Sequence, residues 1–254
     1  MNIFIHYNKE SSKSSQIYND IINNVKNIKL SQEIKTSDII VSIGGDGFLL
    51  NCIFNFSKYG KPFYPINGGS IGFLTNDFNI DTFEEDVINA DQIYLNPLKI
   101  RINNKSEYAF NEMSLLRNSS QAVHLKLIIN NNFVTKIIGD GLIISTPMGS
   151  SGYNYSSGGS ILPLNSNLIS ITPICPCKPK NWRGAIVENN SKIEIQVIDT
   201  IKRGATLNLD NRDLGLIQDI KLSSSTTIDN NMKVSLLFKN FDEYKLKILT
   251  EQFT

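Results

Sequence analysis

Cysteine, histidine and long hydrophobic runs are scarce in this sequence. Its three cysteines, Cys52, Cys175 and Cys177, are an odd number and too few for a disulfide framework, which favours a reducing compartment. The two histidines, His6 and His124, argue against a structural zinc site. No run approaches the ~20 apolar residues that cross a bilayer, and the N-terminus lacks the basic and apolar regions of a signal peptide. We therefore expect a soluble, cytoplasmic protein without a membrane partner.

An excess of charge of either sign is also missing. The 25 Lys and Arg residues against 24 Asp and Glu residues leave a formal net charge of +1, so no strong field attracts nucleic acid. Hydrophobic residues make up 41% and aromatic residues 9% of the 254 residues. That is enough to bury a substantial core, which excludes disorder of the whole chain, and the length fits one large or two modest domains.

The first part of the sequence alternates strand and helix patterns. Residues 2–7 predict a buried strand, and apolar residues at helical spacing follow it. Asp38–Ile43 is a short, continuous apolar run, as in a parallel strand covered on both faces. After four residues comes a helical pattern, Phe48–Phe56, that stops at Gly60. This alternation predicts an open, Rossmann-like α/β sheet.

The middle of the sequence has the pattern of a β-rich domain. Short apolar runs separated by Asn, Gly and Ser, with no convincing helix, are Leu98–Ile102, Val123–Ile129, Ile137–Thr146, Lys192–Ile198 and Thr206–Leu209. Residues 233–238 and 242–253 predict a strand and an amphipathic helix that return to the α/β sheet. We therefore assign residues 1–96 and 230–254 to an α/β domain and residues 97–229 to a β-rich sandwich domain.

Gly44-Gly45-Asp46-Gly47 is the first stretch with a chemical signature. It follows a predicted strand and leads into a helix, the place where ligands bind in open α/β sheets. Glycines let the backbone approach a phosphate, and a helix N-terminus attracts its charge. Asp46 would repel a phosphate unless it accepts a proton from an attacking hydroxyl or holds Mg²⁺, and both roles belong to phosphoryl transfer. The alternative is an ordinary helix N-cap between turn glycines.

A second stretch, from Gly139 to Gly159, is rich in glycine and in Ser and Thr hydroxyls. Such a density can surround a polyanion with donors, and Tyr153 adds an aromatic face. A flexible linker is the alternative, but the stretch contains two tyrosines and lies between apolar strands. Asn111-Glu112 follows a predicted strand and, by composition alone, is an ordinary turn.

Taken in order, these residues resemble the NAD kinase family over essentially the whole chain. The resemblance rests on GGDG at 44–47, N-x-G-x-x-G-F-L at 67–74, Asn111-Glu112, and Asp140-Gly141 followed by S-T-P-x-G-S at 145–150. GGDG also occurs in diacylglycerol and sphingosine lipid kinases and in a phosphofructokinase-like superfamily. The S-T-P-x-G-S-[ST]-x-Y run is much more specific, and it carries most of the resemblance.

The resemblance implies a role for each matching residue. Asp46 would be the base that activates the adenosine-ribose 2′-hydroxyl of NAD⁺, and Asn111 and Glu112 would hold the ribose hydroxyls. Asp140 would bind the nicotinamide side. The residues implied at the phosphate donor are Gly44, Gly45 and Gly47, and those that complete the NAD⁺ site are Gly47, Phe73, Ser151, Gly152, Tyr153, Ser156, Asp210 and Asn211.

Some positions depart from the family pattern. Ser151-Gly152 stands where the family has Thr and Ala, and Met148 stands where Thr or Ser is common. Asp210-Asn211 matches only loosely the family's Asp followed by small and polar residues, and the adjacent Arg212 could equally be a surface charge. Cys175-Pro176-Cys177 has too few partners for a metal site and predicts a tight turn.

The motifs as a set predict an NAD kinase that uses ATP or inorganic polyphosphate, with Mg²⁺ on the donor, to give NADP⁺. A lipid kinase would need an apolar entrance or a basic patch that the composition does not suggest. A silent dinucleotide binder would gain nothing from a carboxylate such as Asp46 close to phosphates. Short strands whose edges need protection favour a homodimer or homotetramer. The family also implies NAD bound between the two domains and across a subunit interface, with Asp140 reaching the neighbouring site.

Overall fold

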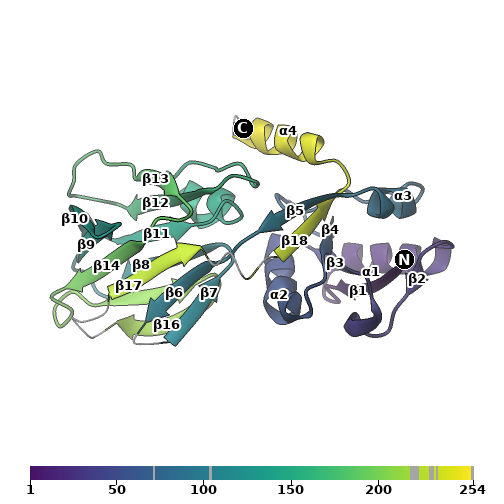
Figure 1. Cartoon of the computed structure of the whole chain (residues 1–254), viewed down its shortest axis with the longest axis horizontal. Coiled ribbons are helices and arrows are strands. Elements are labelled where there is room, and N and C mark those ends of the chain that lie inside the picture. Colours follow the sequence, from purple (N-terminus) through teal and green to yellow (C-terminus); the bar gives the residue numbers. More distant parts are fainter. Residues whose placement is uncertain (71, 103–104, 218–222, 229–231, 233, 253–254) are drawn as a thin grey trace. The chain divides into compact units, whose positions relative to one another are not determined.

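The structure is a computed structural model that describes residues 1–70, 72–102, 105–217, 223–228, 232 and 234–252. The chain divides into two compact units, shown in Figure 1. Unit 1 comprises Met1–Leu95 and Lys233–Thr254, and unit 2 comprises Asn96–Met232. Among the described residues, every helix is too short or too polar to span a membrane.

Unit 1 is built on a six-stranded sheet with the order β2-β1-β3-β4-β18-β5. Neighbouring strands are parallel, except that β5 is antiparallel to β18. The strands are β1 (Asn2–Tyr7), β2 (Lys29–Leu30), β3 (Ile39–Gly44), β4 (Phe63–Asn67), β5 (Asp91–Leu95) and β18 (Val234–Phe238). The helices are α1 (Ser12–Asn24), α2 (Asp46–Phe56), α3 (Phe83–Ile88) and α4 (Phe241–Glu251), with 3₁₀ turns η1 (Ile34–Thr36) and η2 (Ser57–Tyr59).

Local sequence explains these elements. Every residue of β3 is buried, as expected for a parallel strand covered on both faces. Ser11 caps α1 by accepting the N–H of Ser14, and the helix buries Ile17 and Ile21 against the sheet. Gly60 ends the second helical segment in the left-handed conformation (φ 64°), which glycine adopts without strain. The predicted open α/β sheet is confirmed.

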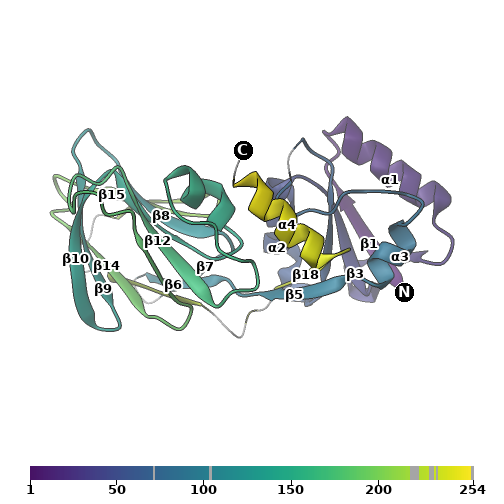
Figure 2. The same ribbon diagram turned by 90° about the horizontal axis from the view of Figure 1, so that it is seen from above.

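The C-terminal segment returns to this sheet. β18 pairs with β4 and β5 and leads into α4. Figure 1 draws β18 and α4 in yellow, and Figure 2 shows α4 from a second direction. The predicted strand and helix over residues 233–238 and 242–253 are therefore confirmed within the described residues. Lys233 and Phe253 lie outside them.

Unit 2 consists of two antiparallel six-stranded sheets, with the orders β10-β9-β14-β17-β6-β7 and β13-β12-β11-β8-β15-β16. The strands of the first sheet are β6 (Leu98–Ile102), β7 (Lys105–Ala109), β9 (Val123–Ile129), β10 (Asn132–Gly139), β14 (Ile193–Ile198) and β17 (Ser223–Ile228). Those of the second are β8 (Glu112–Arg117), β11 (Gly141–Ser145), β12 (Leu168–Ile174), β13 (Ala185–Glu188), β15 (Ala205–Leu209) and β16 (Arg212–Ile217).

One buried cluster joins the two sheets of unit 2 into a sandwich. Ile100 and Leu125 come from the first sheet, and Leu115 and Ile144 from the second. Alternate residues of β14 are buried, as in a sheet with one face on the core. The predicted β-rich sandwich is confirmed.

The apolar run Ile137–Thr146 is β structure, as predicted, but it is interrupted. It spans the end of β10 and all of β11, which belong to different sheets, and the chain crosses between them at Asp140. Ile137 of β10 and Ile144 of β11 both belong to the shared core, so hydrophobicity does not mark the break.

Candidate active site

The two glycine-rich motifs of unit 1 lie side by side. β3 and β4 are parallel with Gly44 opposite Asn67, so both strands end at the same edge of the sheet. The N–H of Gly68 donates to the carbonyl of Gly44 (3.0 Å), which ties the two loops together. The carboxyl edge of this sheet is therefore the candidate ligand site, as the sequence predicted.

Asp46 is the first residue of α2 and is held by the second loop. Its Oδ2 accepts the N–H of Phe73 (2.8 Å) and its Oδ1 accepts the N–H of Leu74 (3.0 Å). The N-cap of α2 is Gly45, and within the described residues no side-chain bond caps this helix. The N-cap interpretation of Asp46 is therefore wrong, and the carboxylate is oriented by a loop 27 residues further along the chain.

Burial raises the pKa of Asp46 above its ordinary value. The two backbone N–H donors and the positive charge of Lys247 act in the opposite direction, because they stabilise the carboxylate. A half-buried carboxylate that is oriented by donors and has a raised pKa is suited to accept a proton.

The glycines around Asp46 fall into two kinds. A Cβ at Gly44 would meet the side chain of Phe48 at 2.6 Å, so close packing accounts for that glycine. Apart from the adjacent residues and the backbone of α2 itself, no described atom lies within 4 Å of the position that a Cβ would take at Gly45 or at Gly47. Packing does not require glycine at these two positions, so they leave open space beside the carboxylate.

Lys13 is a residue at this edge that sequence reasoning missed. It lies in the first turn of α1, and its Nζ donates to the carbonyl of Gly69 (3.0 Å). Ser11, the N-cap of the same helix, donates its hydroxyl to the carbonyl of Gly68 (2.8 Å). A lysine just after the first strand was the only sequence signal, and the approach of residues 68–69 to this helix depends on the tertiary structure.

Unit 2 brings three strand ends together. β8 pairs with β11 and β15, so its first residue lies beside the last residues of both. Asp210, in the turn after β15, accepts the N–H groups of Phe110 (3.0 Å), Asn111 (2.8 Å) and Glu112 (3.2 Å) through its carboxylate. Its own N–H donates to the carbonyl of Glu112 (2.9 Å). The structure therefore joins Asn111, Glu112 and Asp210 into one cluster.

Two side chains of this cluster, those of Glu112 and Asn111, are suited to bind a ligand. Burial, with the charge of Asp210 added, raises the pKa of Glu112 to about 7. Among the described residues, the buried Oδ1 of Asn111 has no hydrogen-bond partner. An unsatisfied buried acceptor is costly, so it marks a place where a bound donor such as a hydroxyl would be stabilised. Burial also raises the pKa of Asp210, against the effect of its three N–H donors.

The S-T-P-x-G-S loop serves mainly as a scaffold for this cluster. Thr146 donates its N–H to the carbonyl of Asn111 (2.9 Å) and its hydroxyl to that of Phe110 (2.7 Å). A Cβ on Gly149 would overlap the backbone of Asn111, so the loop packs directly on it. The hydroxyl of Ser150 bonds to Pro147 (2.7 Å). These hydroxyls bind backbone within the unit, which leaves fewer of them for a polyanion than the sequence suggested.

Other predicted site residues lie in the exposed part of the same loop. η3 (Ser150–Asn154) is a short π-helical turn with a kink at Gly152, next to the half-buried Ser151. Tyr153 is 40% exposed, and burial raises its pKa, with further contributions from the charges of Cys175, Asp140 and Glu112. These side chains therefore share one electrostatic environment. Two further predicted residues, Ser156 and Asn211, are exposed.

Asp140 is engaged within its own chain. Its Oδ1 lies 2.6 Å from Nε of Arg117, and both side chains are about one-third exposed (38% and 35%). Its carbonyl also accepts the N–H of Arg117 (2.8 Å). A ligand that binds Asp140 must share or displace this partner. Arg117 carries no motif signal, because it is adjacent only through the pairing of β8 with β11.

The positions that depart from the family pattern have structural explanations. Met148 is buried, so an apolar side chain suits its place. Arg212 donates to the carbonyl of Tyr108 (2.5 Å) and lies 3.6 Å from Glu107, so it joins two strands. Cys175 has a positive φ of 44°, and Cys177 donates its N–H to the carbonyl of Ile138 (2.8 Å), so the chain bends at Cys175 and packs against β10.

Comparisons with known proteins agree with this site. A family model described as the ATP-NAD kinase C-terminal domain matches residues 110–219. The NAD kinase of Xanthomonas oryzae pv. oryzae (strain MAFF 311018) is 35% identical over 227 residues, which cover 85% of this chain and 86% of that protein. The chain belongs to the NAD kinase family. The NAD kinase of Rickettsia bellii (strain OSU 85-389) is 32% identical over 257 residues, covering 99% of this chain and 97% of that protein.

Solved structures show the NAD kinase fold in this chain. A crystal structure of yeast NADH kinase complexed with NADH has a TM-score of 0.75 at 22% identity, covering 94% of this chain and 84% of that chain. An NAD kinase from Archaeoglobus fulgidus in complex with ATP has a TM-score of 0.72 at 21% identity, covering 94% of each chain. The family model spans Asn111, Glu112 and Asp210, whereas Asp46 precedes it.

Clusters of potential metal ligands are absent from the described part of this NAD kinase family member. Within the part of the chain that the structure describes, no three His, Cys, Asp or Glu residues gather where they could hold a metal ion. Both oxygens of Asp46 already accept backbone N–H groups. A Mg²⁺ site formed by three or more such side chains is therefore absent from the described residues.

Proposed function

We propose that this chain phosphorylates the 2′-hydroxyl of the adenosine ribose of NAD⁺ with ATP, giving NADP⁺. The observation that carries the proposal is the Asp46 carboxylate, which is half-buried at the carboxyl edge of the sheet and oriented by two N–H groups beside open space at Gly45 and Gly47. Membership of the NAD kinase family supports the choice of acceptor. The named NAD kinase complex with ATP supports the choice of donor.

Asp46 is the general base in this proposal. As the 2′-oxygen attacks the γ-phosphorus of ATP, its proton passes to the Asp46 carboxylate, the new P–O bond forms, and the bond to the bridging oxygen of ADP breaks. Lys13 and the glycine-rich loops lie at the same edge of the sheet and are the groups that we assign to the donor phosphates. Catalysis then consists of positioning with help from one base.

Asn111 and Glu112 are the ribose anchors. The unpartnered Oδ1 of Asn111 and the carboxylate of Glu112 are acceptors, and the ribose hydroxyls are donors. Asp210 acts through the backbone of these residues and sets their position. Phe73, Asp140, Ser151, Gly152, Tyr153, Ser156 and Asn211 are assigned to the remainder of NAD⁺.

Among the described residues, no three acidic, His or Cys side chains gather into a metal site. Mg²⁺ would therefore be held mainly by the phosphate donor, where it would supply positive charge that neutralises the phosphates. Three unpaired cysteines suit the reducing cytoplasm, where we place the reaction.

The direct test is to incubate the protein with ATP, Mg²⁺ and NAD⁺ and to measure NADP⁺. Parallel reactions replace ATP with polyphosphate, NAD⁺ with NADH, or NAD⁺ with diacylglycerol. Formation of NADP⁺ supports the proposal. Phosphorylated lipid without NADP⁺ would assign the GGDG motif to a lipid kinase, and binding of NAD⁺ without any transfer would leave a dinucleotide-binding protein.

Gly47→Ala is expected to separate folding from catalysis. Glycine inside a helix costs about 0.5–1 kcal/mol relative to alanine, and a Cβ here meets no described atom beyond its own helix and adjacent residues, so the free energy of unfolding should rise. The same methyl group enters the space assigned to donor phosphates, so kcat/KM for ATP should fall severalfold. Denaturant melts and ATP kinetics check both. Asn51→Ala, at an exposed position of α2, is the control and should leave the kinetics unchanged.

The active unit is expected to be a homodimer or homotetramer. Edge strands β10, β13 and β16 of unit 2 carry exposed apolar side chains, which a second copy would cover. They are Phe133, Val134, Ile186, Leu214 and Leu216. Sedimentation should show little monomer at micromolar concentration, and specific activity should fall on dilution as the oligomer dissociates.

Subunit mixing tests whether Asp140 completes the site of a neighbouring copy. Asp46→Asn and Asp140→Ala chains are each expected to be weakly active, and mixed oligomers should recover activity because one site then has both residues intact. Exchange of subunits without recovery would place both residues in a single subunit's site.

A further inference from the structure

The loop that orients Asp46 is itself held by the C-terminal helix. Nζ of Lys247, on α4, donates to the carbonyl of Gly72 (2.8 Å), the residue just before the two N–H donors to Asp46. Gly72 has no room for a side chain, because a Cβ there would overlap the hydroxyl of Thr75. Lys247 therefore contacts the backbone of the loop one residue before the two N–H donors to Asp46.

The other end of this loop is fixed to the sheet by Asn76. The side-chain Nδ2 of Asn76 donates to the carbonyls of Pro65 and Leu237 (both 2.9 Å), and its Oδ1 accepts the N–H of Lys239 (3.0 Å). These bonds hold the loop between β4 and β18. Lys247 holds the loop at Gly72, and Asn76 holds its other end. Bonds to the C-terminal segment therefore determine where residues 73 and 74 lie.

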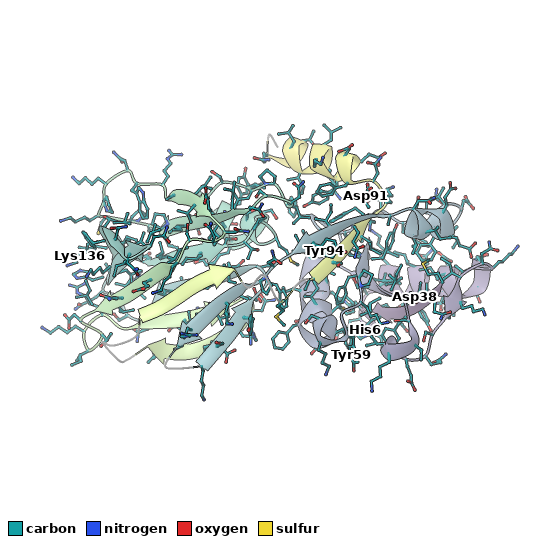
Figure 3. All side chains as sticks on the ribbon, in the orientation of Figure 1. His6, Asp38, Tyr59, Asp91, Tyr94 and Lys136 are labelled. Atoms are coloured by element: carbon teal, nitrogen blue, oxygen red, sulfur yellow. The ribbon has the colours of Figure 1, made fainter. Side chains whose placement is uncertain are left out.

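The start of α4 is firmly placed. Asn240 caps it, and the N–H of Phe241 donates to Oδ2 of Asp91 (2.9 Å), a residue labelled in Figure 3. The ring of Tyr244 packs against Phe238 with ring centroids 4.4 Å apart. Burial raises the pKa of Tyr244, and the charge of Asp46 adds to this, so the tyrosine is a neutral neighbour of the carboxylate.

We propose that Lys247 is a positioning residue for the phosphoryl transfer, which acts on Asp46 by holding the loop at Gly72 and by placing a positive charge near the carboxylate. This inference rests on the proposed function. It gives the C-terminal helix a role in catalysis, although α4 lies about 200 residues from Asp46 in the sequence. Lys247 donates to a backbone carbonyl of the loop, so it acts on Asp46 through that loop.

The direction of the charge effect is defined. The charge of Lys247 lowers the pKa of Asp46, while burial raises it. The other described groups near the Asp46 carboxylate are the N–H donors of Phe73 and Leu74 and the neutral Tyr244. Loss of the Lys247 charge should therefore raise the pKa of Asp46. A base that must be deprotonated would then become active at higher pH.

The test compares Lys247→Met, Lys247→Arg and Lys245→Met. Lys247→Met should lower kcat by about 10- to 100-fold, because a small misplacement of a catalytic group has effects of that size, with KM for NAD⁺ little changed. The acidic limb of the kcat profile should move to higher pH. Lys247→Arg keeps the charge and the donors and should restore most of both. Lys245, exposed and paired with Asp242 (2.6 Å) on the same helix, is the control.

A second readout does not depend on enzyme activity. Carbon-13 NMR titration of the Asp46 carboxyl, assigned with Asp46→Asn, should show a higher pKa in Lys247→Met than in the parent protein. An unchanged titration and an unchanged pH profile would overturn the proposal, even if the melting temperature falls. If the parent protein makes no NADP⁺ but the titration shifts, the proposed function fails while the effect of Lys247 on Asp46 stands.

Discussion

Asp46→Asn should lower kcat by about 10²–10⁴-fold at saturating NAD⁺ and ATP, because the amide cannot accept the proton of the 2′-hydroxyl. KM for NAD⁺ should change little, since Asp46 is assigned to the reaction and not to binding. The variant keeps the shape of the side chain. Its amide can still accept one of the two N–H groups that Asp46 binds, at Phe73 or Leu74.

The measurement is steady-state turnover beside a thermal melt. One lost hydrogen bond costs about 0.5–1.5 kcal/mol, so the melting temperature should fall by a few degrees at most and the protein should be folded at the assay temperature. Asp81→Asn, at an exposed position in the same unit, is the matched control and should be fully active. A folded Asp46→Asn protein with near-normal turnover would show that Asp46 is not the general base and only orders residues 73 and 74.

Glu112→Ala should weaken NAD⁺ binding by about 10- to 100-fold. A hydrogen bond to a charged group contributes roughly 1.5–3 kcal/mol, and each 1.4 kcal/mol is a factor of ten in the dissociation constant. Calorimetry with NAD⁺ measures the change. Glu188→Ala, at an exposed position of β13 in the same sheet, should bind as the parent does. Equal NAD⁺ affinity in Glu112→Ala and the parent would show that Asn111-Glu112 is an ordinary turn and does not bind the ribose.

The pH dependence of this binding has a defined sign. The pKa of Glu112 is raised to about 7, so its carboxylate becomes charged as the pH passes through 7. NAD⁺ affinity should increase over that range and should be flat in Glu112→Gln. Stability changes in the opposite direction. Between pH 4.5 and about 7 the folded state binds more protons at Glu112 than the unfolded state, so this residue lowers the free energy of unfolding as the pH rises.

The local pattern was enough to predict most of unit 1. A buried strand such as β3 is a continuous apolar run because both faces of the sheet are covered, and Gly60 marks the end of the second helical segment. The same signals did not mark the break within Ile137–Thr146, where two strands of different sheets have similar hydrophobicity. Short strands such as β13 and β16 were missed because they lie at sheet edges and contain polar residues.

The sequence by itself determined the class of fold and the chemical groups of the site. GGDG and the S-T-P-x-G-S run stand out by their residue types, because phosphate contact and close backbone packing favour glycine and hydroxyl side chains. Asn111-Glu112 is an ordinary turn by composition and was assigned only through the resemblance to the NAD kinase family. The tertiary structure alone decided what those residues do for one another. Asp46 is oriented by residues 73 and 74, Asp210 holds residues 110–112, and Lys247 reaches Gly72.

These partners are 27, 99 and 175 residues apart. Strand order and register, which depend on how apolar faces pack together, bring them within hydrogen-bond distance. Periodicity within a short window carries information about one element at a time. For that reason the residue types of the active site can be read from the chain, while the pKa values of Asp46 and Glu112 depend on burial that only the folded protein provides.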